Sequence, residues 1–583
     1  MGRQLRSLER RKQSRRQNGR KKGRGLPLFF LLCFVIVLGA GGFYVYQEKY
    51  APSKEHADLK TYFGVSGNEV AIFLNDEQEK DKKGDPVAAR CVNGGVFLPF
   101  EWVMDTLNRR FYYESDANSI YYTTQAGTEI YTTDTLIDGA TPFIKMGDSS
   151  KDLYLNVKLV EKYTDLRYQS FSDSEEKRVF LYTDWKAYTE ATVNAQESVR
   201  LLGGIKSSIL TTLPKESKVK IRESMDTWSQ VVTSDGFIGY LRNSRLKDRK
   251  EVTPKSDFVK ENFQYRTRTD GQKVVLGFHQ VLNKTANKGF ENVSADTPGM
   301  NTIAPTWFVL TDNAGGFENH GDASYVAAAH QKGLQVYATV NNFEKGKIAM
   351  DEVLGKAANR QNLINNLIAQ AKALGLDGLN IDFETIPESC GRSYVQFMRE
   401  FGNAAHAAEL TASADVYVPF DYNKYYDIEE IGKFLDYVIV MCYDEHYAGG
   451  EAGSVSSIGY VERGIERSTE QMDRSRVIIA VPFYTRVWKT DANGKTSSDA
   501  LGAADALKWA QSKGAQFTWD EELKQNYTEI TENGVLKKCW MEDEKSMAEK
   551  MNAVREADVG GVAAWKLGQE PADFWPLLNL NSK

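Results

Sequence analysis

Residues 377–384 read Asp-Gly-Leu-Asn-Ile-Asp-Phe-Glu, a short apolar run in which every second side chain after the glycine is polar. Side chains of a β-strand alternate between its two faces, so the three polar residues share one face and the apolar residues between them face covering helices. The polar residues are Asn380, Asp382 and Glu384. Burying them is costly unless they are hydrogen-bonded or used in chemistry. The stretch therefore predicts a strand with a functional polar face and Glu384 at its carboxyl end.

Seven other apolar runs accompany this strand between residues 272 and 578. The eight runs are 274–278, 302–305, 335–340, 378–383, 410–416, 437–441, 477–481 and 561–565. Helical patterns such as 361–373 separate several of them. Eight βα units in about 300 residues predict an α/β fold, a (β/α)8 TIM barrel over 272–578, with active residues at the carboxyl ends of the strands. A doubly wound sheet is the alternative, but no GxGxxG or Walker pattern follows the first run.

Charge and cysteine content exclude several classes of protein. The chain has 583 residues, 73 Lys and Arg against 79 Asp and Glu, and a net charge of −6. Eleven of the basic residues and one acid lie in residues 1–25, so the remainder carries 62 − 78 = −16 and is a poor match for nucleic acid. Five Cys without a CxxC pair and six His argue against a disulfide scaffold and a zinc module. We therefore expect no metal and no cofactor.

The basic segment 1–25 precedes 21 uncharged residues at 26–46, long enough to span a bilayer as a helix. Basic residues on its N-terminal side favour a cytoplasmic N-terminus, with the rest of the chain exported. A transmembrane helix at 26–46 is the prediction. The alternative is a cleaved signal peptide, because the small residues 39–41 offer a cleavage site.

Residues 61–190 read as strand, helix and hairpin, which indicates a small α+β unit. The pattern resembles the copper amine oxidase N-terminal-like domain and predicts a stalk. Residues 195–247 read as all-β, with Val199-Arg200, a W-x-x-V starting at Trp228 and a D-G-x-x-G-Y starting at Asp235. This second pattern resembles the bacterial SH3-like domain, a family that commonly binds cell-wall peptide. A folded spacer with Trp228 in its core remains an equal alternative.

The strand at 377–384 also resembles the DGxDxDxE signature of glycoside hydrolase family 18, with Asn380 where chitinases have Asp and Phe383 where they often have Trp. Residues 441–444 resemble the family's M-x-Y-D after the sixth strand. Residues 481–486 resemble its P-F-Y-G-R, with Thr485 in place of Gly, and Trp565 ends the eighth strand, where the family keeps a Trp. Four motifs in the right order span about 300 residues, the length of a TIM barrel.

The resemblance implies a retaining, substrate-assisted glycosidase. Glu384 would act as general acid and then base, and carboxylate crowding would keep it protonated near neutral pH. Asp382 would hold the substrate's acetamido N–H, Tyr443 its acetyl oxygen. The other implied site residues are Asn380, which would orient Asp382, the sugar contacts Asp444, Tyr484 and Asn341, and the stacking floor Trp565. Structural alternatives stay open: barrel packing for Tyr443, core for Trp565 and a turn for Asn341.

Residues 340–343 stand after the third strand, where chitinases carry an S-x-G-G turn, and residues 305–308 follow the second strand. Both stretches resemble wall-lytic N-acetylglucosaminidases and spore-cortex proteins. We therefore expect a membrane-tethered, extracytoplasmic enzyme that cleaves β-1,4 bonds of N-acetylglucosamine in peptidoglycan. The alternatives are an inactive glycan-binding barrel, a chitinase and an endo-β-N-acetylglucosaminidase. His279 and His446 either line the pocket or are structural.

Overall fold

The computed structural model describes residues 25–147, 149–268, 270–343 and 348–581. The chain divides into two compact units, one of residues 1–99 and 154–258 and one of residues 100–153 and 259–583. The stretch predicted as a stalk, 61–190, thus has residues in both units, and its family assignment stays a prediction.

The first unit contains two sheets after an apolar helix. Helix α1 (Gly25–Lys49) includes a 21-residue stretch, Phe29–Lys49, with a mean hydropathy of 2.2 and no burial. It is the one helix in the described ranges that is long and apolar enough to span a membrane. One sheet has the order β10-β11-β1-β3-β4-β9 and the other β14-β13-β17-β16-β15-β12-β18. The bounds of the first are β1 (Glu69–Leu74), β3 (Ala88–Val92), β4 (Gly95–Pro99), β9 (Leu153–Asn156), β10 (Arg167–Phe171) and β11 (Lys177–Tyr182).

The second sheet covers the region predicted to be SH3-like. Its strands are β12 (Tyr188–Val193), β13 (Glu197–Arg200), β14 (Ile209–Leu213), β15 (Lys218–Ser224), β16 (Trp228–Thr233), β17 (Ile238–Arg242) and β18 (Leu246–Val252). The alternating apolar side chains of these strands form a small core that includes Val199, Val231 and Leu241. Trp228 lies outside this core and is half-buried. The SH3-like assignment and its ligand stay predictions.

The second unit contains the predicted barrel. Eight parallel strands of its described residues close into a ring, because each pairs with its neighbours and the last pairs with the first. In ring order they are β19 (Val274–His279), β20 (Thr302–Pro305), β23 (Gln335–Asn341), β24 (Gly378–Asp382), β25 (Thr411–Tyr417), β26 (Tyr437–Met441), β27 (Val477–Pro482) and β33 (Gly561–Trp565). All eight predicted runs coincide with these strands, which confirms the TIM-barrel fold.

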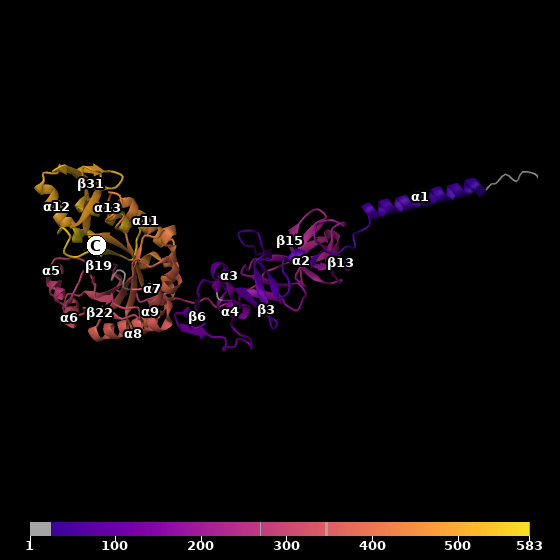
Figure 1. Ribbon diagram of the computed structural model, residues 1–583, viewed down its shortest axis with the longest axis horizontal. Coiled ribbons are helices and arrows are strands. Elements are labelled where there is room, and N and C mark those ends of the chain that lie inside the picture. Colours follow the sequence, from indigo (N-terminus) through magenta and orange to yellow (C-terminus); the bar gives the residue numbers. More distant parts are fainter. Residues whose placement is uncertain (1–24, 148, 269, 344–347, 582–583) are drawn as a thin grey trace, which may run out of the picture. The chain divides into compact units, whose positions relative to one another are not determined.

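Helices surround this ring (Figure 1). They include α5 (Phe290–Val293), α6 (Ala323–Gln331), α7 (Met350–Gly355), α8 (Ala357–Leu374), α9 (Gly391–Ala407), α11 (Ile458–Thr469), α13 (Glu544–Glu556) and α14 (Phe574–Leu578). Helix α8 ends at Leu374 and is capped by Gly375, whose φ of +76° suits a glycine. The outward faces of the strands and the inward faces of the helices form one large core. Leu379, Ile381 and Phe383 lie in it, as predicted, and Phe383 stacks on Phe397 of α9 at 5.5 Å between ring centroids.

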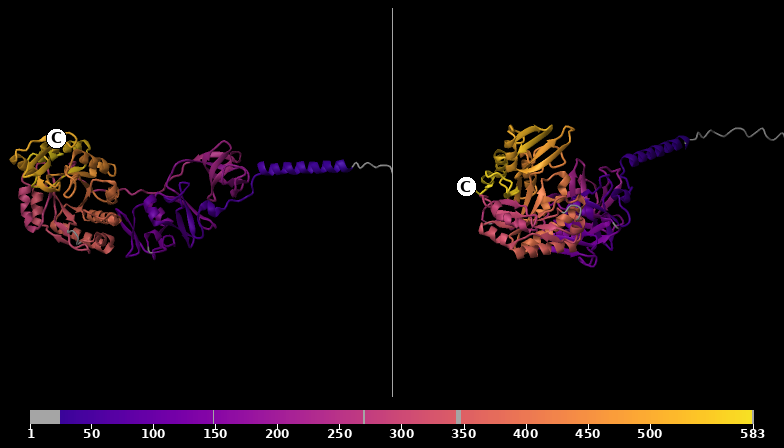
Figure 2. Two further views of the ribbon diagram at one scale, coloured as in Figure 1. Left: turned by 45° about the horizontal axis from the view of Figure 1, so that its top comes forward. Right: turned by 60° about the vertical axis from the view of Figure 1, so that its left-hand side comes forward.

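Two antiparallel sheets are added to the barrel. One joins β27 to β33 and has the order β29-β28-β32-β31-β30, with helix α12 (Ala503–Ser512) beside it (Figure 2). Its strands are β28 (Tyr484–Thr490), β29 (Thr496–Gly502), β30 (Thr518–Asp520), β31 (Gln525–Glu532) and β32 (Val535–Met541). The other consists of β5 (Phe111–Glu114), β6 (Ser119–Thr124) and β7 (Gly127–Tyr131), and it packs on α9.

Buried ion pairs attach the β5–β7 sheet to the barrel. The Arg110 and Arg399 guanidinium groups lie 2.9 and 3.0 Å from the Glu430 carboxylate. Arg360 of α8 is fully buried and lies 3.4 Å from Glu114 of β5 and 3.0 Å from Glu400 of α9. Burial alone would raise the pKa of Glu430, but the nearby cations, Arg399 foremost, lower it to about 2.

Candidate active site

Strand β24 carries the predicted polar face into the barrel interior. Asn380 and Asp382 are 0% and 5% exposed, and Glu384, two residues beyond, is half-buried. The neighbouring strand β25 is in parallel register with β24, so Asn380 lies opposite Ser413. Ser413 donates a hydrogen bond to Asn380 Oδ1 at 2.8 Å, and Asn380 Nδ2 donates one to Asp415 Oδ2 at 2.6 Å. The amide of Asn380 is thereby fixed between two side chains of β25.

Asp382 is a buried carboxyl group with an unsatisfied acceptor. Among the described residues, its Oδ1 has no hydrogen-bond partner. Burial, then the charges of Asp415 and Glu384, raise the pKa of Asp382 well above its usual range. An acceptor without a partner costs about 1–3 kcal/mol when buried. Retaining such a group at the end of a barrel strand is typical of a functional site.

Glu384 is held by contacts from two other strands. Tyr417, at the end of β25, donates its phenolic hydrogen to Glu384 Oε2 at 2.9 Å. Asn342, directly after β23, accepts a hydrogen bond from the Glu384 backbone N–H at 3.0 Å and donates one to its carbonyl at 2.9 Å. The next residue, Thr385, has a φ of +53°, a conformation that β-branched residues rarely adopt. The chain therefore turns sharply after Glu384, while Asn342 and Tyr417 fix the residue before the turn.

The residues after β26 and β27 form the facing side of the site. Tyr443 is half-buried, and burial followed by the Asp415 and Asp382 carboxyls raises its pKa well above its usual range. The Tyr443 and Tyr484 rings meet edge to face at 6.2 Å. Tyr484 donates a hydrogen bond to Asp444 Oδ1 at 2.6 Å. Both tyrosines are therefore neutral hydroxyl donors near the carboxyl groups.

The remaining predicted residues differ in whether they lie beside the carboxyl groups or pack in the core. Asn341 is 3% exposed and lies opposite Asp382 in the β23–β24 register. Trp565 is half-buried at the end of β33 and packs against the inner core, 5.6 Å from the ring of Phe278. His279 is buried and hydrogen-bonded to Tyr325 OH at 2.9 Å, and burial lowers its pKa to about 4, which fits the structural alternative. His446 contacts the carbonyl of Glu451 at 3.1 Å.

Three residues of this site do not appear among the sequence-predicted ones: Asn342, Asp415 and Tyr417. A signal for two of them exists in the sequence, because Thr411, Ser413, Asp415 and Tyr417 alternate with apolar residues as those of β24 do. The described residues contain no group of three or more His, Cys, Asp or Glu arranged to hold a metal ion. The arrangement instead suits proton transfer to and from a ligand at the strand ends.

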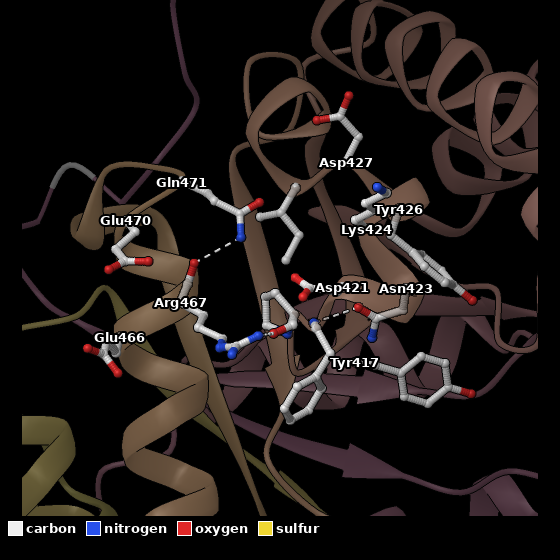
Figure 3. Close-up of a pocket in the computed structure, with 13 residues that line it drawn as sticks. Tyr417, Asp421, Asn423, Lys424, Tyr426, Asp427, Glu466, Arg467, Glu470 and Gln471 are labelled. Atoms are coloured by element: carbon white, nitrogen blue, oxygen red, sulfur yellow. Dashed lines mark hydrogen bonds between the residues drawn. The ribbon is translucent and has the colours of Figure 1, made fainter. Parts of the chain in front are cut away.

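Tyr417 also borders a cavity of about 460 Å³ beside the site. Figure 3 shows Glu466, Arg467 and Glu470 of the α11 side on one wall and Asp421 and Lys424 on the other. Arg467 donates a hydrogen bond to the Pro419 carbonyl at 3.0 Å. None of the site residues predicted from the sequence lines this cavity, and its charges of both signs define no single ligand.

The sequence of this chain is similar to those of known proteins. Residues 238–570, more than half of the chain, match the family described as Glycosyl hydrolases family 18. The glycosylase YdhD of Bacillus subtilis (strain 168) is 26% identical over 300 residues, 50% of this chain and 71% of the relative. The cortical fragment-lytic enzyme of Bacillus anthracis is 24% identical over 250 residues, 41% of this chain and 58% of the relative. The crystal structure of the Bacillus cereus spore cortex-lytic enzyme SleL aligns with a TM-score of 0.49 and 21% identity, covering 57% of this chain and 77% of the other. The chain belongs to glycosyl hydrolase family 18 and is a glycosidase.

Proposed function

We propose that the barrel hydrolyses β-1,4 bonds of N-acetylglucosamine-containing cell-wall glycan with retention of configuration. The observation that carries this proposal is the pairing of two different carboxyl groups at the carboxyl end of β24. Asp382, the last residue of the strand, is buried with an unsatisfied acceptor oxygen, and Glu384, two residues beyond it, is held by the Tyr417 hydroxyl. An acetamido N–H is a donor that Asp382 can accept, and a glycosidic oxygen is a group that Glu384 can protonate.

In this mechanism the substrate supplies its own nucleophile. Glu384 protonates the leaving glycosidic oxygen while the N-acetyl carbonyl oxygen of the sugar being cleaved attacks the anomeric carbon of that same sugar, and the bond from this carbon to the glycosidic oxygen breaks. Asp382 accepts the acetamido N–H and stabilises the oxazolinium cation, and Tyr443 donates a hydrogen bond to the acetyl oxygen. Water then attacks the anomeric carbon and opens the oxazolinium ring, while Glu384 takes a proton from this water. The acetamido group is restored, and the enzyme returns to its starting state. Asn380 orients Asp382 from its position on β24, where Ser413 and Asp415 of β25 fix its amide. Asp444, Tyr484, Asn341 and Trp565 contact the sugars.

The names of relatives support a bacterial wall glycan as the substrate, since several are cortical fragment-lytic enzymes. Chitin is the second candidate, because an endochitinase of Brugia malayi is 23% identical over 295 residues. We also propose that α1 anchors the enzyme to the cell membrane with the barrel outside. Its length, its hydropathy and the basic residues before it support an anchor.

The test is digestion of purified peptidoglycan and of chitin oligosaccharides, with mass spectrometry of the products to identify the new reducing sugar. The wild type should release N-acetylglucosamine ends from peptidoglycan. The Glu384→Gln variant should turn over at least about 100-fold more slowly, because acid–base catalysis contributes about 10²–10⁴. Equal rates for the two proteins would refute the role of Glu384. Binding without new reducing ends in the wild type would favour a glycan-binding barrel.

A further inference from the structure

Asp415 is a second carboxyl group in the barrel interior, and its position makes it a neighbour of Asp382. The register of β24 and β25 pairs Asn380 with Ser413 and Ile381 with Ala414, so the next pair in both strands is Asp382 with Asp415. Facing residues of adjacent strands point to the same side. Both carboxyl groups therefore point into the barrel at the same level.

Neither carboxyl group is compensated in the way that buried charges usually are. Asp415 is 4% exposed, and its Oδ2 accepts one hydrogen bond, from the neutral amide of Asn380. Among the described residues, Oδ1 of Asp415 and Oδ1 of Asp382 both lack a hydrogen-bond partner. Two adjacent buried carboxylates repel each other and are poorly solvated, so a pair of this kind retains a proton.

The titratable groups around the pair do not remove this need for a proton. In the described part of the chain, the groups that act on the two carboxyls are Glu384 and the tyrosines Tyr394, Tyr426 and Tyr443. Glu384 adds a further carboxyl, and burial raises the pKa of each tyrosine, so these three stay neutral. The pKa of Asp415 is likewise raised well above its usual range, by burial first and by Glu384 after the opposing hydrogen bond of Asn380.

We propose that Asp382 and Asp415 hold one proton between them, and that Asp415 is a positioning residue that keeps this proton while Asp382 carries the negative charge. The inference rests on the proposed function for its catalytic consequence. When the acetamido N–H binds Asp382, the proton remains on Asp415, so a single charge faces the oxazolinium cation. No bond is broken and no proton leaves the pair. Asn380 donates to Asp415 Oδ2 and so fixes the carboxyl that keeps the proton.

The experiment compares Asp415→Asn with a variant that moves the carboxyl group to the other strand, N380D/D415N. Infrared spectra of the full chain in detergent, recorded from pH 5 to 8 with carbon-13 labelled aspartate, report protonated aspartic acid groups through their C=O stretch. The band present at pH 7 in the wild type should vanish in Asp415→Asn and return in the double variant, whose barrel interior again holds two neighbouring carboxyl groups. Asp436→Asn is the matched control, because it removes a buried carboxylate that accepts three N–H bonds, and it should leave the band unchanged.

Kinetics supply the second readout. Asparagine at position 415 mimics a neutral Asp415 and still offers an acceptor to Asn380, so turnover should stay within about tenfold of the wild type, roughly the value of one hydrogen bond. The Asp382→Asn variant should lose at least about 100-fold, since its charge is removed. A band that persists in Asp415→Asn would overturn the shared proton. If Asp415→Asn does not fold, absence of the band from N380D/D415N would overturn it.

The two proposals fail in different ways. If the wild type cleaves neither peptidoglycan nor chitin, the proposed function fails, while the infrared band still decides whether the pair holds a proton. If the wild type is active and Asp415→Asn loses activity as severely as Asp382→Asn, Asp415 must be ionised during the reaction, and the inference is wrong although the function stands.

Discussion

The hydroxyl of Tyr417 gives a direct measure of how much positioning contributes to the action of Glu384. It donates to Glu384 Oε2 at 2.9 Å in a half-buried site. A hydrogen bond to a carboxyl that can ionise is worth about 1.5–3 kcal/mol, which corresponds to roughly 10–150-fold in rate. Water can replace part of this bond at a half-buried position, so the lower end applies. We expect Tyr417→Phe to lower kcat about tenfold with little change in KM.

The matched control is Tyr425→Phe. Tyr425 donates its hydroxyl to the carbonyl of Ile386 at 2.9 Å and makes no contact with Glu384 that the structure records. The two variants remove the same atom and break a hydrogen bond of the same length, so any loss of stability should be similar. Initial rates on peptidoglycan, with melting temperatures as a check, measure the difference. Equal rates for Tyr417→Phe and Tyr425→Phe would refute a positioning role for Tyr417.

Two other predictions concern stability and location. The pKa of Glu430 is lowered to about 2 from 4.5, so its ion pairs with Arg399 and Arg110 stabilise the fold above pH 4.5, and this stability is lost as the pH falls toward 2. The shift corresponds to about 3 kcal/mol, and Glu430→Gln should flatten the decline of melting temperature with acid. Deletion of residues 1–49 should move the protein from the membrane fraction to the culture supernatant when a cleavable signal peptide is supplied, as immunoblots of both fractions would show. If the protein expressed with residues 1–49 is recovered in the supernatant as fully as the deletion variant, residues 26–46 are cleaved and do not anchor it.

The sequence predicts the barrel well because of how parallel strands are buried. Strands covered on both faces read as continuous apolar runs, and each of the eight runs became a strand of the ring. The polar face of β24 was visible for the same reason, since three polar residues alternate within such a run. Local patterns of this kind depend only on residues within one element.

The parts of the site that the sequence did not reveal depend on pairing between elements. Asp415 becomes relevant only when the β24–β25 register places it beside Asp382, and alternation within β25 does not identify that neighbour. Asn342 reads as a turn residue, yet its side chain bonds both backbone groups of Glu384. The attachment of the β5–β7 sheet is harder still, because Arg110 and Glu430 are 320 residues apart.

Polar residues inside the barrel are concentrated on one arc of strands, where we propose that the chemistry takes place. The inner face is apolar on β19, β27 and β33, where residues such as Leu276, Ile478 and Ala563 pack together. On β24 and β25 it is polar, and Asp382 and Asp415 there retain unsatisfied oxygens. Apolar side chains in that arc would pack at lower cost, since a buried carboxyl without full compensation destabilises a fold. The packing of the apolar arc offsets that cost in stability. The carboxyl groups of the polar arc can then hold the negative charge that, in the proposed mechanism, stabilises the oxazolinium cation.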